Sequence, residues 1–172
     1  TYIRLFAYLT GLFSPNVLFQ GTLLEMYGQG VILTGKSGIG KSEVALELIK
    51  KGHRLVADDA IIIHQIGQEI HGRAPEHLKH LLEVRGIGLI DVYKMFGINY
   101  IADHKTIRYV IELDHLDGNQ TIQRLQETPK LKKILQTEVP SATILVGGGR
   151  NIADLVEVAV TNLRLRAKGY NP

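Results

Sequence analysis

The run Gly35–Ser42, GKSGIGKS, constrains this chain more than any other feature. It fills every fixed position of G-x-x-x-x-G-K-[ST], a loop whose backbone N–H groups surround nucleotide phosphates. A functional loop of this kind follows a strand and opens a helix, because the helix N-terminus adds positive charge. The whole run is predicted to contact phosphate: Gly35, Lys36, Ser37, Gly38, Ile39, Gly40, Lys41 and Ser42.

Both flanks of this run have the required pattern. Residues 30–34 form a short apolar run with β-branched residues, which is typical of a buried strand. Residues 42–51 place apolar side chains at helical spacing, and Gly52 supplies a helix end. We therefore interpret the run as a phosphate loop rather than a glycine-rich turn. Lys41 would contact the terminal phosphates, and the Ser42 hydroxyl would bind Mg²⁺.

Size and composition favour one ordinary domain. With 172 residues and no cysteine, the chain is long enough to bury a core without disulfides, and it fits a reducing cytosol. The basic residues are scattered and the net charge is only +3, so we expect no nucleic-acid partner. No apolar run reaches the roughly 18 residues that cross a bilayer, so we expect a cytoplasmic protein without a membrane partner.

Apolar periodicity predicts strands that alternate with helices, which indicates an α/β domain. The predicted strands are 22–26, 30–34, 55–57, 60–66, 107–113 and 142–146; the predicted helices are 42–51, 76–84 and 152–168, with helical turns in 117–136. Because the chain opens without Met, we expect residues 1–20 to be a linker or the remnant of a preceding domain, and residues 21–172 to be the catalytic domain.

Two acidic residues follow the predicted strand 55–57. Asp58 and Asp59 lie just after the loop helix, where a phosphate-loop protein places the acid that meets Mg²⁺ or its waters. Adjacent strand residues point to opposite faces, so we expect the two carboxylates to have different roles.

The segment 81–92, LLEVRGIGLIDV, places charges inside an apolar run. Glu83 and Arg85 need partners there, because an unpaired buried charge is costly. Either they pair with each other or they face a charged ligand, and the residues alone leave both possibilities open.

Three motifs together closely resemble the catalytic domain of bacterial HPr kinase/phosphorylase: GKSGIGKS, GHRLVADD at 52–59, and LLEVRGIGLIDV. The resemblance extends from about Gly21 to Asn171, and the third motif is similar to that family's signature segment.

The resemblance implies an enzyme that phosphorylates a serine of the phosphocarrier protein HPr with ATP or pyrophosphate. It also implies removal of that phosphate by phosphorolysis with inorganic phosphate, in carbon-catabolite regulation. The implied fold is a single phosphate-loop domain similar to phosphoenolpyruvate carboxykinase around its nucleotide site, with a mixed sheet and flanking helices. Members of this family form hexamers.

Site roles also follow from the resemblance. Lys41 matches the phosphate-loop lysine, and Ser42 and Glu83 match the magnesium ligands. Asp59 matches the base of the forward reaction, which acts as an acid in reverse, and Arg124 matches a catalytic arginine. Residues 82–91 would serve both reactions, and residues 145–150 would serve chiefly dephosphorylation.

The chain departs from the family at two places. Gln20 stands where the family has a histidine, and glutamine can bind a phosphate but cannot carry a proton. Residues 17–21 also resemble a viral 3C-type protease recognition sequence. The alternative explanation for Gln20 is therefore that this segment was engineered. The segment 145–150 contains three glycines where the family usually has a proline and a basic residue.

Two other functions stay open from the residues. A small-molecule kinase or ATPase would use the same loop and acids on a metabolite. A nucleotide-sensing module would bind ATP without turnover.

Overall fold

The computed structural model describes residues 15–116 and 129–170. Its strands are β1 Asn16–Gln20, β2 Thr22–Met26, β3 Gln29–Gly35, β4 Arg54–Ala57, β5 Ala60–Ile66, β6 Glu69–Arg73, β7 Leu81–Val84, β8 Gly88–Asp91, β9 His104–His115, β10 Lys130–Ile134 and β11 Thr137–Val146. The helices are α2 Lys41–Lys50, α3 Val92–Phe96 and α4 Ile152–Ala167, with 3-10 turns η1 Glu76–Leu78 and η2 Ile98–Tyr100.

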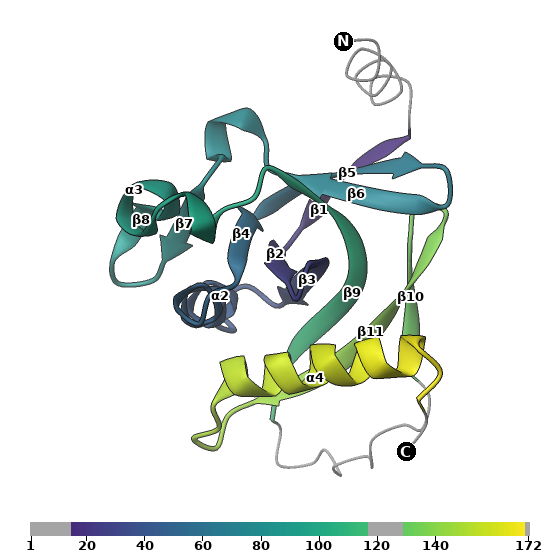
Figure 1. Ribbon diagram of the computed structural model, residues 1–172. Coiled ribbons are helices and arrows are strands. Elements are labelled where there is room, and N and C mark those ends of the chain that lie inside the picture. Colours follow the sequence, from purple (N-terminus) through teal and green to yellow (C-terminus); the bar gives the residue numbers. More distant parts are fainter. Residues whose placement is uncertain (1–14, 117–128, 171–172) are drawn as a thin grey trace, which may run out of the picture.

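The long strand β9 organises a mixed nine-stranded sheet. Its neighbours run in the order β1-β5-β6-β9-β3-β2-β4. Strand β6 pairs with residues 104–106 of β9, whereas β11 pairs in parallel with residues 110–115 and carries β10 on its far side. Figure 1 shows β9 curving between these two sets of partners. Strands β7 and β8 form a separate hairpin.

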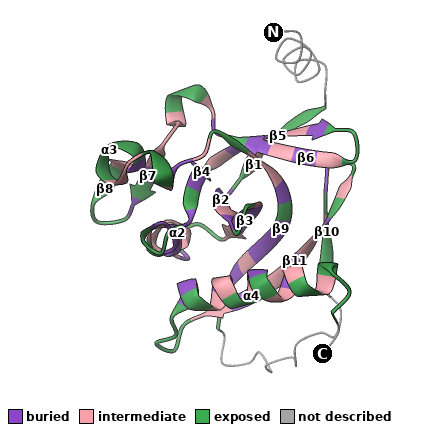
Figure 2. Cartoon of the chain, in the orientation of Figure 1, coloured by how far each residue is buried: buried purple, intermediate pink, exposed green. Residues whose placement is uncertain are grey.

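Strand β3 is buried on both faces, which explains its continuous apolar sequence. Val31 and Leu33 pack in a core with α2 and α4, whereas Ile32 belongs to a second core formed mainly by β4, β5 and β9. Figure 2 shows the buried residues concentrated on β3 and β9, with the outer side of α4 exposed. The phosphate loop therefore extends from a strand that is covered on both faces.

The carboxyl ends of three strands meet at one edge. Strands β3, β9 and β11 are parallel, and Gly35 lies opposite Leu113 while Val146 lies opposite His115. Residues 36–40, which follow β3, and residues 147–150, which follow β11, consequently leave the sheet at the same edge. Ligand sites of α/β proteins lie outside such carboxyl ends.

The predicted strands and two of the predicted helices are present. The expected helix over 76–84 is wrong, because only η1 is helical and Leu81–Val84 forms β7. Its residues alternate between buried and exposed, which is the pattern of a strand. Of the helical turns expected over 117–136, residues 117–128 lie outside the described residues and Lys130–Ile134 is a strand. Residues 16–20, expected in a linker, form β1 and pair with β5.

None of the helices in the described ranges is long and apolar enough to cross a membrane.

Candidate active site

The phosphate loop joins β3 to α2 through left-handed backbone positions. Gly38 has φ 86° and Gly40 has φ 106°, a conformation that costs glycine little and other residues more. Gly40 caps α2 without any side-chain hydrogen bond. The first N–H groups of α2 therefore have no capping side chain, which leaves them able to bind an anion. Ile39, which is buried, anchors the loop in the core.

Lys41 reaches back along this loop. Its Nζ donates a hydrogen bond of 2.6 Å to the carbonyl of Gly35, the last residue of β3. The Lys41 side chain thus connects the end of the loop at α2 with its beginning at β3, and the ammonium group lies beside the loop. A lysine in this position can follow phosphate oxygens as a compact positive charge.

Arg85, in the turn between β7 and β8, lies directly against the loop. A Cβ atom on Gly38 would lie 2.8 Å from Nη2 of Arg85. Neither Arg85 nor Glu83 takes part in any ion pair within the described part of the chain. Both residues are exposed, so solvent can meet their charges and they need not pair with each other.

Asp58 connects this hairpin to the sheet. One carboxylate oxygen accepts a 2.8 Å hydrogen bond from the Thr22 hydroxyl, and the other accepts a 3.2 Å hydrogen bond from the backbone N–H of Glu83. Burial raises the pKa of Asp58, although these hydrogen bonds counteract it. Both oxygens of Asp58 are therefore engaged in holding β7 beside β2.

Asp59 differs from its neighbour in exposure and in backbone conformation. It is exposed and has φ 67°, an uncommon conformation for a non-glycine residue. Its backbone carbonyl accepts a 3.2 Å hydrogen bond from Gly21, and Gln20 pairs with Ala60 in the adjoining register. The two acids therefore differ in burial and in contacts: Asp58 is buried and accepts hydrogen bonds from Thr22 and Glu83, whereas Asp59 is exposed.

The potential metal ligands are carried by separate elements. Ser42 is the second residue of α2, and the exposed Glu83 lies on β7 with its backbone fixed by Asp58. Hydroxyl and carboxylate oxygens are donors that Mg²⁺ prefers. Within the described ranges no group of three or more histidine or acidic residues could hold a metal by itself. Substrate phosphates and waters would have to supply the remaining ligands, as is usual for Mg²⁺.

The loop after β11 carries the second glycine run. Gly148 and Gly149 have φ 68° and 71°, and Arg150 donates a 3.3 Å hydrogen bond to the carbonyl of Leu145. Asn151 then caps α4 by accepting a hydrogen bond from the N–H of Asp154. This loop shares the sheet edge of the phosphate loop.

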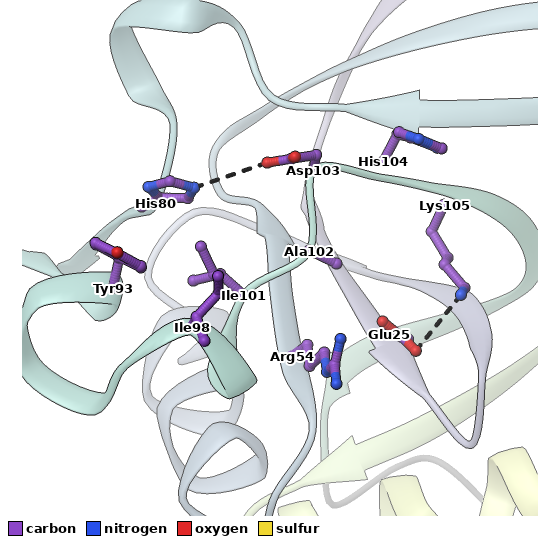
Figure 3. A pocket seen from close by; sticks show the side chains of 10 residues that line it. All are labelled: Glu25, Arg54, His80, Tyr93, Ile98, Ile101, Ala102, Asp103, His104 and Lys105. Carbon is purple, nitrogen blue, oxygen red and sulfur yellow. Dashed lines mark ion pairs between the residues drawn. The ribbon is translucent and has the colours of Figure 1, made fainter.

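A hollow lies at the end of the strands opposite the phosphate loop. Figure 3 shows this cavity of about 590 Å³, in which Lys105 pairs with Glu25 and His80 faces Asp103. Glu25 pairs with Gly30 at the start of β3, whereas Thr22 pairs with Leu33 near the loop. The predicted site residues do not line this cavity.

Comparison with known proteins identifies the family. A sequence model described as the HPr serine kinase C-terminal domain matches residues 12–172. The chain belongs to this family. The HPr kinase/phosphorylase of Caldanaerobacter subterraneus subsp. tengcongensis is 46% identical over 169 residues, which are 98% of this chain and 55% of that protein. The HPr kinase/phosphorylase of Geobacillus kaustophilus is 47% identical over 169 residues, covering 98% of this chain and 54% of that protein.

A solved structure agrees with this membership. The Hpr(Ser) kinase/phosphatase from Coxiella burnetii superposes with a TM-score of 0.83 at 32% sequence identity, over 90% of this chain and 94% of that chain. The resemblance drawn from three motifs is confirmed, and so is a mixed α/β fold with flanking helices. The chain spans about half the length of the curated relatives that it matches.

All predicted site residues except Arg124 lie in the described part of the chain. Arg85 lies against the phosphate loop at Gly38, and Asp58, which precedes Asp59 in the chain, binds the backbone of Glu83. Arg124 lies outside the described residues. Arg85 is the residue that sequence reasoning left without a role, although its charge inside an apolar segment was the available signal.

Proposed function

We propose that this chain transfers the terminal phosphate of ATP, or of pyrophosphate, to a serine of HPr, and removes that phosphate with inorganic phosphate as the acceptor. The observation that carries the proposal is the convergence of three motifs. Arg85 contacts the loop at Gly38, and Asp58 holds the backbone of Glu83. The printed names of the relatives, HPr kinase/phosphorylase, support the same reaction.

The loop would bind the polyphosphate. Backbone N–H groups from Gly35 to Ser42, together with the Lys41 ammonium, would neutralise phosphate oxygens, in the manner of the phosphoenolpyruvate carboxykinase nucleotide site. Arg85 on one side, and Arg124 by the family resemblance, would add guanidinium groups that match phosphate geometry. When Mg²⁺ is bound, it neutralises the charge that develops on the transferred group. Ser42 and Glu83 would hold it.

Asp59 would move the proton. A serine hydroxyl is a weak nucleophile at neutral pH, so the Asp59 carboxylate would accept its proton as the oxygen attacks phosphorus. In the reverse direction the protonated Asp59 would return this proton to the serine oxygen as phosphate takes the phosphoryl group. The exposure of Asp59 supports this role, because a protein side chain can approach it.

The replacement of the family histidine by Gln20 would affect the removal of phosphate from HPr. Gln20 ends β1 beside the acid pair, where it can donate hydrogen bonds to a phosphate but cannot transfer a proton. The hexamer that the resemblance implies stays a prediction, which sedimentation of the purified protein would test.

One assay separates the candidate functions. The chain is incubated with Mg²⁺, HPr and ATP labelled on the terminal phosphate. Label on an HPr serine supports the proposal, whereas free phosphate without labelled HPr indicates an ATPase. Binding of ATP without turnover indicates a nucleotide sensor.

A further inference from the structure

A cluster of charged side chains fastens the end of α2 to α4. Nε2 of His53 lies 2.8 Å from one carboxylate oxygen of Glu157, and Nζ of Lys51 lies 3.3 Å from the other. Lys51 also pairs with Asp154, one turn earlier on α4. Lys51 caps α2 and His53 follows it by two residues, so a single carboxylate holds both residues at the end of this helix.

An aromatic ring and a further cation adjoin this contact. The Tyr27 hydroxyl lies 3.4 Å from Glu157, and the Tyr27 ring meets the His53 ring edge-on at 5.2 Å. Arg164 lies over the Tyr27 ring, 5.1 Å from its centre. His53 is only 8% exposed. Charge-assisted hydrogen bonds of this kind are stronger than those between neutral groups.

Glu157 is held as a carboxylate by its partners. Burial by itself would raise its pKa, but the hydrogen bonds from His53 and Lys51 outweigh burial, so the pKa of Glu157 is lowered. The acceptor for both groups at the end of α2 is therefore charged at neutral pH.

The two helices joined here begin at the two glycine loops of one sheet edge. Helix α2 starts with Lys41, directly after the phosphate loop, and α4 starts with Ile152, directly after the loop that contains Gly147–Gly149. We infer that Glu157 and His53 are positioning residues. Their contact fixes α2 against α4, and thereby fixes the phosphate loop relative to the second loop. This inference rests on the proposed function only in assigning ATP to the phosphate loop.

Apolar packing alone does not provide this precision. The inner face of α2 consists of Val44, Ala45, Leu48 and Ile49, which fix the helix in the core. Such packing is not directional, so it leaves tilt and sliding less defined than a hydrogen bond of 2.8 Å does. A ten-residue helix is about 15 Å long, so a small tilt at its end displaces the loop at its start. Small displacements in a phosphate site reduce affinity and rate strongly.

The test compares Glu157→Gln, His53→Gln and the double variant with the unaltered chain. Isothermal titration calorimetry gives the dissociation constant of MgATP, at a temperature where circular dichroism shows every variant to be folded. We expect each single variant to bind MgATP about three- to tenfold more weakly. The double variant should be no weaker than the weaker single variant, because both substitutions remove the same contact.

The matched control is Glu47→Gln, an exposed carboxylate on α2 that makes no ion pair or side-chain hydrogen bond in the described structure. Its MgATP affinity should equal that of the unaltered chain. Variants with a lower melting temperature but unchanged MgATP affinity would overturn the inference, since the pair would then only stabilise the fold. Independent, multiplying losses in the double variant would also overturn it. Because this titration needs no HPr, a chain that binds MgATP but fails to phosphorylate HPr contradicts the proposed function alone.

Discussion

The backbone N–H of Glu83 donates a 3.2 Å hydrogen bond to the buried carboxylate of Asp58. This bond attaches the β7–β8 hairpin to the sheet, and the same carboxylate also accepts from the hydroxyl of Thr22. The hairpin in turn brings Arg85 against the phosphate loop at Gly38. One buried acid therefore sets the position of a proposed metal ligand and of a cation beside the loop.

Asp58→Asn tests this structural role through the pH dependence of stability. Because burial raises the pKa of Asp58 above its ordinary value of 3.8, the folded protein holds this proton more tightly than the unfolded chain does. The stabilisation from Asp58 is full below pH 3.8 and declines as the pH rises through the raised pKa. The asparagine variant lacks this titration, and its amide has an acceptor oxygen at only one of the two positions that bind Thr22 and Glu83. In acid we expect it to be less stable by about 1–3 kcal/mol.

Urea unfolding of both proteins between about pH 4 and pH 7 measures this difference. We predict that the advantage of the unaltered chain shrinks as the pH rises. An advantage that grows with pH would contradict the assignment.

Gly38→Ala is expected to weaken phosphate binding. Alanine at this position would have to adopt a φ of 86°, which is unfavourable for a residue with a side chain. Its Cβ atom would also lie 2.8 Å from Nη2 of Arg85, so the loop or the arginine must move. We expect about tenfold weaker MgATP binding, equal to about 1.4 kcal/mol, by calorimetry. Gly67→Ala is the control, because Gly67 also has positive φ, 63°, but no atom within 4 Å of a new Cβ. It should cost stability without changing the affinity, and equal MgATP affinity in both variants would contradict the prediction.

Glu83→Gln is expected to raise the Mg²⁺ requirement. The amide keeps the size of the side chain but removes the negative charge that a hard cation prefers. We predict that the Mg²⁺ concentration for half-maximal HPr phosphorylation rises by about tenfold or more. Glu138→Gln, at an exposed position of β11, serves as the control. An unchanged Mg²⁺ dependence in Glu83→Gln would remove Glu83 from the metal site.

The elements around the loop were predictable because local pattern and tertiary structure agree there. The apolar run 30–34 is buried in β3, and Leu48 and Ile49 face the core from α2 as their helical spacing predicted. The same holds for α4, whose spacing predicts its buried face and whose cap is Asn151. Where the local sequence preference agrees with the tertiary packing in this way, the element can be predicted without knowledge of distant residues.

The segment 76–84 was not predictable in this way. Leu78, Leu81 and Leu82 have helical spacing, yet the chain forms a strand from Leu81 onward. That strand depends on Asp58, which is far away in the sequence and accepts from Glu83. Strand β6 was missed for a related reason. The predicted strand 60–66 is followed at Gly67 by the turn of a hairpin that joins β5 to β6, a pairing that no local apolar pattern indicated.

Within the candidate site, the sequence indicated which types of residue matter, but it did not indicate which residues lie next to one another. A charged pair inside an apolar segment indicated a ligand or a salt bridge, but only the fold shows Arg85 beside Gly38. The two acids were expected to differ, but which one is buried depends on Thr22 and β7. The role of Arg124, which lies outside the described residues, stays a prediction.

The most direct test of the account is the activity of Asp59→Asn in both directions. Labelled ATP with HPr measures phosphorylation, phosphoserine-HPr with inorganic phosphate measures phosphorolysis, and calorimetry measures MgATP binding. Asp103→Asn, at the opposite end of the strands, is the matched control. The account predicts that Asp59→Asn loses both activities while its MgATP affinity stays within about twofold. Phosphorylation of HPr at an undiminished rate by Asp59→Asn would contradict the central claim.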